Sequence, residues 1–240
     1  MARELTFTVY RFDPEKETRP HFDTFTVKER PYMNVLEALM YIMQENDGSL
    51  AFRYSCRGAV CGSCAMSING KIALACRTQT KDITPPQVRV EPLPRLPAIK
   101  DLVVDMEFFW RHYRDIRPWL IPEEPAPEKE RLMSAKELKK VEPFINCILC
   151  GACYASCPVV TRDRDFLGPA ILAKVYRFLA DPRDVRGIEL LEIVNSQQGV
   201  WGCDTIFNCV RVCPKDVRPT DAIVATRKRL VGRLFRFLGM

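Results

Sequence analysis

Two cysteine runs, CILCGACYASCP at residues 147–158 and CDTIFNCVRVCP at residues 203–214, decide the organisation of the second half of this chain. The first run has the spacing C-x2-C-x2-C-x3-C-P. The second repeats it with one exception, because Ile206 stands where the second cysteine is due. Such a matching period, ended each time by Cys-Pro, is typical of thiolates that hold two iron-sulfur cubanes.

The spacing assigns the cysteines to two clusters. In this type of run, three cysteines ligate one cluster and the fourth ligates the other. A [4Fe-4S] cluster is therefore predicted on Cys147, Cys150, Cys153 and Cys213. The second cluster is predicted on Cys157, Cys203 and Cys209. Because Ile206 leaves its fourth corner without a thiolate, we predict that this cluster lacks one iron and is [3Fe-4S].

A third motif lies in the first half of the chain, where residues 56–64 read CRGAVCGSC and Cys76 follows. The spacing C-x4-C-x2-C…C is that of plant-type [2Fe-2S] proteins. The predicted ligands are Cys56, Cys61, Cys64 and Cys76. Gly58 and Gly62 suit a loop that wraps the cluster closely, because glycine tolerates positive φ. Arg57 either assists the cluster electrostatically or is a solvated arginine at a loop tip.

Two other uses of the cysteines fit the pattern less well. A disulfide framework prefers an even number of cysteines in a short secreted protein, whereas this chain has 240 residues and eleven cysteines. Zinc is the better rival, since C-x2-C pairs are common in tetrahedral sites. A zinc site, however, needs neither a third cysteine at the same step nor a following proline. A structural metal-binding module therefore remains only an alternative.

Composition and charge set wider bounds. The length allows two domains, and 47% hydrophobic residues suffice for real cores. No apolar run reaches the roughly 18 residues of a membrane span, and the start lacks the apolar stretch of a signal peptide, so a soluble, intracellular chain is expected. A net charge of +6 favours an acidic partner or anionic lipid. Without a base-stacking aromatic motif, nucleic acid is not expected as a partner.

The N-terminal half predicts a small sheet. Residues 5–12 and 21–27 alternate as half-buried strands do, Asn34 and Glu37 form a capping box for a helix, and Asn69-Gly70 predicts a second hairpin. Residues 88–93 complete the sheet. We predict an α+β fold in which residues 1–105 form a β-grasp, plant-type [2Fe-2S] ferredoxin domain.

The remainder, residues 106–240, is predicted as a mostly helical, bacterial-ferredoxin-like domain carrying the [4Fe-4S] and [3Fe-4S] clusters. Helices are expected at residues 101–114, from Gly168-Pro169 to residue 181, at residues 188–195 and after residue 214, and a proline-rich linker at residues 118–127.

The last helix ends in a basic tail, residues 227–238, with interleaved Leu230, Leu234, Phe235 and Leu238. It either lies against an anionic membrane or a membrane-bound partner, or docks on its own domain. Deletion of residues 227–240 is expected to weaken docking and leave the clusters intact.

Taken together, the motifs resemble the iron-sulfur subunit of the succinate dehydrogenase and fumarate reductase family. The likeness is carried, in order, by YSCRG at 54–58, CGSC at 61–64, LAC at 74–76, IKDLVVD at 99–105, GPA at 168–170 and CPK at 213–215. It implies an electron relay on the cytoplasmic face of the inner (plasma) membrane. Electrons would pass from FAD on a flavoprotein subunit, through the three clusters in series, to quinone at a membrane anchor with or without haem b. No Rossmann or P-loop glycine pattern occurs here, so flavin chemistry belongs to another chain.

The resemblance also implies a quinone side. Pro158 and Ile206 match the family's quinone-side surface, whereas Thr161-Arg162 and Asp204 stand where ubiquinone-using members commonly have a tryptophan pair and a histidine. A ubiquinone site of the usual kind is therefore not expected, and either direction of the reaction fits. The alternative is an iron-sulfur subunit of another flavin-linked oxidoreductase, of the glycolate oxidase or heterodisulfide reductase type. Those chains usually have two complete cubane runs and no plant-type domain.

Overall fold

The computed structural model of the chain describes residues 3–237. These residues form two compact units. The first contains the chain up to Met106 together with Ile148–Ser156, and the second contains Glu107–Cys147 and the chain from Cys157 onward. Residues 148–156 thus pack with the N-terminal unit, although they lie inside the first cubane run.

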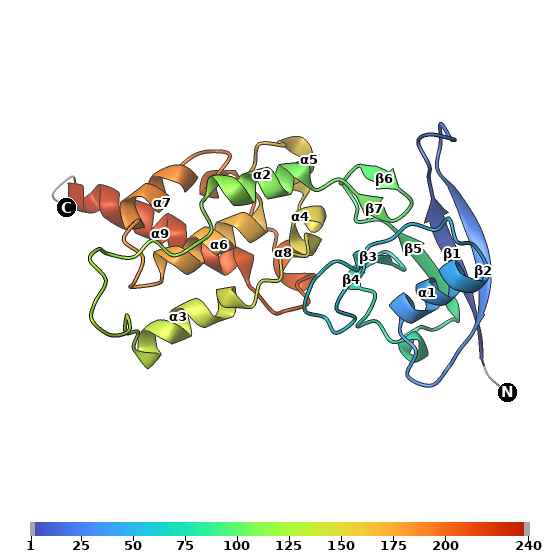
Figure 1. The fold of residues 1–240 in the computed structure, drawn as a ribbon. Helices are drawn as coiled ribbons and strands as arrows, with labels where there is room; N and C mark the ends of the chain where they lie inside the picture. The colour runs from blue at the N-terminus through green and yellow to red at the C-terminus, as the bar shows by residue number, and fades with distance from the viewer. Residues whose placement is uncertain (1–2, 238–240) are drawn as a thin grey trace. The chain divides into compact units, whose positions relative to one another are not determined.

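The first unit is built on a mixed sheet with the strand order β2-β1-β5-β3-β4 (Figure 1). Its strands are β1 (Glu4–Arg11), β2 (His21–Lys28), β3 (Ala65–Ile68), β4 (Lys71–Leu74) and β5 (Gln87–Glu91). The predicted hairpins β1-β2 and β3-β4 are both present and antiparallel, with Asn69-Gly70 at the second turn. β5 is the central strand and runs parallel to β1, so it joins the two hairpins.

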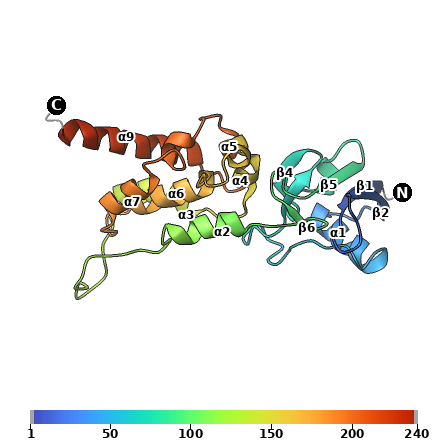
Figure 2. The same cartoon turned by 90° about the horizontal axis from the view of Figure 1, so that it is seen from above.

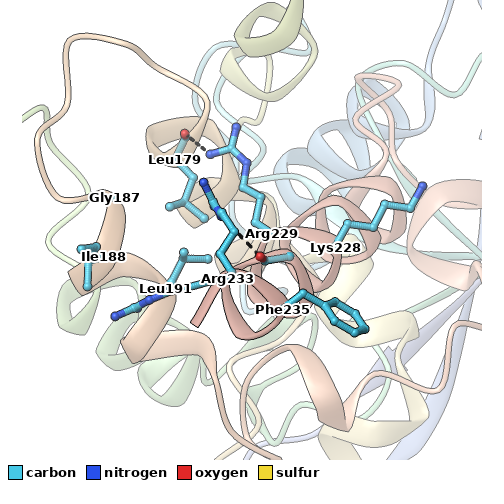
Figure 3. Close-up of a pocket in the computed structure, with 10 residues that line it drawn as sticks. Leu179, Gly187, Ile188, Leu191, Lys228, Arg229, Arg233 and Phe235 are labelled. Atoms are coloured by element: carbon cyan, nitrogen blue, oxygen red, sulfur yellow. Dashed lines mark hydrogen bonds between the residues drawn. The ribbon is translucent and has the colours of Figure 1, made fainter. Parts of the chain in front are cut away.

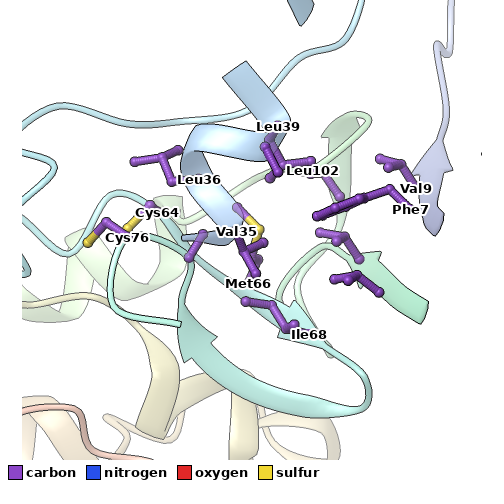
Figure 4. Packing of buried hydrophobic residues seen from close by; sticks show 14 of the residues in the cluster. Phe7, Val9, Val35, Leu36, Leu39, Cys64, Met66, Ile68, Cys76 and Leu102 are labelled. Carbon is purple, nitrogen blue, oxygen red and sulfur yellow. The ribbon is translucent and has the colours of Figure 1, made fainter. Parts of the chain in front are cut away.

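Helix α1 (Val35–Glu45) packs its apolar face against this sheet (Figure 4). The predicted capping box is present, because Asn34 accepts from the backbone N–H of Glu37 and the Glu37 carboxylate accepts from the N–H of Asn34. The residues that α1 and the sheet bury between them include Phe7, Val9, Val35, Leu36, Leu39 and Val88. Each such side chain contributes about 1.5–3 kcal/mol when it is fully buried, so this core holds the cluster loops on a rigid base.

The segment after the sheet differs from the prediction of a helix at residues 101–114. Residues 98–104 form the short strands β6 (Ala98–Lys100) and β7 (Val103–Val104), and helix α2 begins only at Glu107 and ends at Asp115. The reason is Asp101, which is 1% exposed and has φ of 44°. Its carboxylate accepts from the N–H groups of Phe12 and Ala51 and from Arg11, which fixes a turn where the helix was expected.

The second unit is helical, as predicted (Figures 1 and 2). Besides α2 it contains α3 (Ala135–Ile145), α5 (Pro158–Arg162), α6 (Pro169–Leu179), α7 (Gly187–Val194), α8 (Asn208–Arg211) and α9 (Pro219–Phe237), whereas α4 (Ala152–Ser156) belongs to the first unit. Short 3-10 turns cover Thr80–Asp82 and Val200–Gly202. α6 is central, since α3, α7 and α9 all pack against it. Within residues 3–237, no helix combines the length and the apolar character that crossing a membrane requires.

Two features of this unit were not predicted. Helix α3 was missed although Ser134 and Glu137 form a full capping box. The proline-rich linker is held by Arg186, which is 4% exposed and paired with the buried Asp184. Arg186 donates to the carbonyl oxygens of Arg117 at 2.9 Å and Trp119 at 2.7 Å. The linker is therefore fixed to the start of α7 by a buried cation.

Candidate iron-sulfur sites and family

The loop predicted to hold [2Fe-2S] directs its backbone N–H groups at one sulfur. The Cys56 Sγ accepts from the N–H of Gly58 at 3.4 Å, Val60 at 3.3 Å and Cys61 at 3.2 Å. Arg57 and Ala59 have φ of 55° and 57°, in the left-handed region. Alternation of this kind turns successive N–H groups to one side and forms an anion-binding concavity, as in many iron-sulfur sites.

The chemistry of these cysteines fits a cluster. The N–H groups of Cys61, Gly58 and Val60 lower the pKa of Cys56 to about 6, which favours the thiolate that iron requires. Cys64 and Cys76 lie side by side at the edge of the core (Figure 4), and burial raises the pKa of Cys64 to about 12. Loading of iron must therefore displace a proton from Cys64. Arg57 lies over the ring of Tyr54, with its guanidinium carbon 5.7 Å from the ring centroid.

The [2Fe-2S] loop also contacts the first cubane run within the same unit. Gly62 has φ of +74°, and a Cβ added there would lie 2.7 Å from the Cβ of Cys150 and 3.0 Å from the carbonyl oxygen of Ile148. Only glycine permits this approach. The backbone of one predicted cluster loop therefore touches a predicted ligand of the next cluster.

Of the four predicted [4Fe-4S] ligands, two lie in each unit. Cys150 and Cys153 belong to the first unit, and Cys147 and Cys213 to the second. In the second unit, Cys147 and Cys213 pack against a small buried cluster of Phe144, Ala173, Val217 and Ala222. Burial raises the pKa of Cys213, and the N–H groups of Lys215 and Val217 oppose that shift.

The three predicted [3Fe-4S] ligands meet inside the second unit. Cys157 immediately precedes α5 and is 8% exposed, and Cys209 is 6% exposed. Burial is the main cause that raises the pKa of both thiols, and the neighbouring Cys203 sulfur raises both further. The Cys203 Sγ accepts from the N–H of Thr205 at 3.4 Å, and the Cys209 Sγ lies 3.1 Å from the Thr220 Oγ1.

No group of three or more His, Cys, Asp or Glu side chains in residues 3–237 is placed to hold a single metal ion. An iron-sulfur cluster consists of several atoms, so its ligands surround a volume and need not converge on one point.

The predicted quinone-side residues flank the three-iron site. Ile206 is 43% exposed between Thr205 and Phe207, which have φ of 56° and 62°. Pro158 is exposed at the first position of α5. Arg162 and Asp204, the residues noted above as departures from ubiquinone-using members, form a two-pronged ion pair with distances of 3.1 and 3.2 Å.

Arg227 contacts the segment that contains the predicted ligand Cys203, and sequence reasoning did not single it out. Its guanidinium donates to the carbonyl oxygens of Val200 at 2.6 Å and Cys203 at 2.7 Å, and to the Thr205 Oγ1 at 3.2 Å. It also lies over the ring of Trp201, 5.7 Å from the centroid. Nothing in the local sequence separates Arg227 from the other cations of the tail.

The contacts of Arg227 with the Cys203 segment, called the Arg227 clamp below, bear on the predicted effect of deleting the tail. Deletion of residues 227–240 would also remove Arg227, which donates to the carbonyl oxygen of Cys203. That all three clusters survive this deletion stays a prediction. Leu238, the last apolar residue predicted for the tail, lies outside the described residues.

Comparison with known proteins identifies the family. Residues 6–111 match the model of a 2Fe-2S iron-sulfur cluster binding domain, and residues 144–217 match that of a 4Fe-4S dicluster domain. The succinate dehydrogenase iron-sulfur subunit of Coxiella burnetii is 42% identical, over 95% of this chain and 97% of that relative. The fumarate reductase iron-sulfur subunit of Mycobacterium tuberculosis is 39% identical, over 93% of this chain and 91% of that relative.

The chain belongs to the succinate dehydrogenase and fumarate reductase iron-sulfur subunit family. A chain of the Mycobacterium smegmatis Sdh1 complex in the apo form has the same fold, with a TM-score of 0.88 and 26% identity over 97% of this chain and 98% of that one. The predicted α+β fold, the iron-sulfur cofactors and the role as electron-relay subunit are thereby confirmed.

Proposed function

We propose that this chain carries electrons between a flavoprotein subunit, which interconverts succinate and fumarate at FAD, and a quinone at a membrane anchor. The observation that carries the proposal is the contact between Gly62 and Cys150, because it brings two cluster loops of different types together in one unit. When bound, the clusters supply one-electron transfer. The residues of the chain hold them close together and orient the backbone donors around their sulfurs.

The proposed ligand sets use all eleven cysteines. [2Fe-2S] is held by Cys56, Cys61, Cys64 and Cys76; [4Fe-4S] by Cys147, Cys150, Cys153 and Cys213; and [3Fe-4S] by Cys157, Cys203 and Cys209. The [2Fe-2S] loop faces the flavoprotein in this proposal, since Cys56 is exposed and Val60 is 64% exposed at the loop tip. Backbone N–H groups around Cys56 and Cys203 stabilise negative charge on those sulfurs and so favour the reduced clusters.

At the other end of the relay, Pro158 and Ile206 contact quinone. Both are exposed next to the three-iron ligands. The Arg162–Asp204 pair places charged side chains beside Pro158 and Ile206, where ubiquinone-using members commonly have aromatic ones. This supports a quinone site unlike that of ubiquinone-using members. The subunit lies peripherally on the cytoplasmic face of the membrane, and haem b, where present, belongs to the anchor.

Iron and acid-labile sulfide analysis of the anaerobically reconstituted chain tests the ligand sets. About nine irons per chain are expected, in three clusters with separate electron paramagnetic resonance signals. Zinc in place of iron, or four irons at the third site, would contradict the assignment. Quinones extracted from the complex purified with its anchor identify the acceptor, and succinate-dependent quinone reduction by that complex tests the relay itself.

A further inference from the structure

A groove of about 780 Å³ runs between α9 and the segment formed by the end of α6 and the start of α7 (Figure 3). Its apolar lining comes from Leu179, Ile188, Leu191 and Phe235. Leu179 and Leu191 are each 8% exposed, whereas Ile188 is 59% and Phe235 47% exposed. The groove therefore has a fixed hydrophobic floor and an open apolar mouth.

Cations surround this groove. Lys228, Arg229, Arg233 and Arg236 line it, and none of its described lining residues is acidic. Arg229 is occupied, since it donates to the carbonyl oxygen of Leu179. Arg233 lies 3.7 Å from Glu192 in an exposed pair, and such pairs contribute little. Lys228 and Arg236 are exposed, and no carboxylate lines the groove beside them. The Arg236 Nε donates to the carbonyl oxygen of Gly232 at 3.3 Å within the helix.

The same helix carries an exposed apolar stripe beside its cations. Val231 is 42% exposed and Leu234 is 57% exposed, and both lie within one turn of Phe235. α9 has no acidic residue after Asp221. A basic helix with such a stripe has the composition of helices that lie in the interface of an anionic membrane.

We propose that the groove binds one anionic phospholipid, with its phosphate at Lys228 and Arg236 and an acyl chain across Ile188, Leu191 and Phe235. Charge complementarity favours an anion at the rim. The apolar floor favours a lipid over an acidic peptide, because no side chain of this lining can accept a hydrogen bond from the backbone N–H groups that a peptide brings. An acyl chain carries no such groups. The proposal does not depend on the electron-relay assignment.

Co-sedimentation of the full, cluster-loaded chain with phospholipid vesicles tests the proposal. Binding is expected to phosphatidylglycerol vesicles, to weaken as salt is raised, and to be at least tenfold weaker with phosphatidylcholine vesicles. Equal binding to both kinds of vesicle, or no binding to phosphatidylglycerol, overturns it. The second outcome would assign the groove to a protein partner instead.

A charge variant locates the headgroup. Lys228→Gln with Arg236→Gln should weaken binding to phosphatidylglycerol vesicles about thirtyfold, since each cation near an anionic surface contributes on the order of 1 kcal/mol. The matched control is Lys136→Gln with Lys139→Gln, two exposed cations on α3 that do not line the groove. An equal loss in the control would show that net charge alone drives binding, and would overturn the assigned site.

A shape variant locates the acyl chain without changing charge. Gly232 lines the groove, and a Cβ there meets nothing within 4 Å. Gly232→Trp should fill the groove and weaken binding of short-chain phosphatidylglycerol in titration calorimetry about tenfold. Gly232→Ala keeps the groove open and should bind as the parent does. Unchanged binding by the tryptophan variant, with its cluster spectra intact, overturns the acyl-chain placement.

Discussion

The [2Fe-2S] loop and the three-iron site hold their predicted cluster ligands in different ways. The loop at residues 56–64 is one continuous segment, and its own backbone supplies the N–H groups that contact Cys56. The three-iron site draws Cys157, Cys203 and Cys209 from separate segments, and Arg227 of α9 holds one of them by side-chain contacts. The first site therefore depends on local conformation, and the second on packing within its unit.

The difference predicts where each site is vulnerable. A change of backbone freedom should damage the [2Fe-2S] loop, whereas the loss of a distant side chain should damage the three-iron site. The one local feature that distinguishes the three-iron site is Ile206, which sets the type of cluster rather than its position.

Ile206→Cys should have the largest effect on function. A cysteine at residue 206 restores the x2 spacing from Cys203 and to Cys209, and the third cluster should become [4Fe-4S]. The added thiolate brings negative charge, so the reduction potential should fall. A drop on the order of 200 mV makes one-electron reduction about 5 kcal/mol less favourable. Electron paramagnetic resonance of the oxidised protein measures the change.

The control for this variant is Phe207→Cys, which adds a thiol one residue out of register and should keep the three-iron signal. Succinate oxidation with an acceptor that draws from the flavin should be spared in both variants. An unchanged three-iron signal in Ile206→Cys would refute the spacing argument.

Gly62→Ala should destabilise the first unit by about 2–5 kcal/mol. The methyl group would overlap Cys150, and alanine is strained at the positive φ of this residue. The expected result is a loss of [2Fe-2S] content and a lower thermal midpoint. Gly70→Ala is the matched control, since Gly70 has φ of +75° and nothing within 4 Å of an added Cβ. If both variants lose equal stability, the contact between the two loops is not what requires glycine.

Arg227→Gln should lower the three-iron content and leave the [2Fe-2S] signal unchanged. The substitution removes hydrogen bonds from a charged group to the carbonyl oxygens of Val200 and Cys203, which contribute on the order of 3 kcal/mol. Integration of the two signals in one sample gives the ratio. The control is Lys228→Gln, which changes the neighbouring exposed cation and should leave the ratio of the three-iron signal to the [2Fe-2S] signal unchanged. A normal ratio in Arg227→Gln would show that the loop is held without this clamp.

Arg162→Gln should have the smallest effect on stability, because the Arg162 and Asp204 side chains are 65% and 43% exposed and water screens their attraction. Thermal unfolding of the loaded chain at low and high salt measures it. The difference from the parent should shrink as salt is raised. A loss of three-iron signal would show instead that the pair positions the ligand segments.

Most of the local elements could be predicted from sequence. The strand hairpins, the capped helix α1 and the start of α6 at Gly168-Pro169 follow from alternation, a capping box and a Gly-Pro pair, which act between neighbours in the chain. The predicted helix at residues 101–114 was wrong at its start. Its pattern did not reveal that Asp101 would be buried among donors from Phe12 and Ala51.

The sequence by itself determined the ligand type and the cluster types predicted here, because the number and spacing of thiolates are properties of the covalent chain. Tertiary structure alone decided that Gly62 touches Cys150, that residues 148–156 pack with the N-terminal unit, and that Arg227 holds the Cys203 loop. These contacts join residues far apart in the chain. They depend on how the cores pack, and the spacing of residues along one segment of the sequence does not specify that packing.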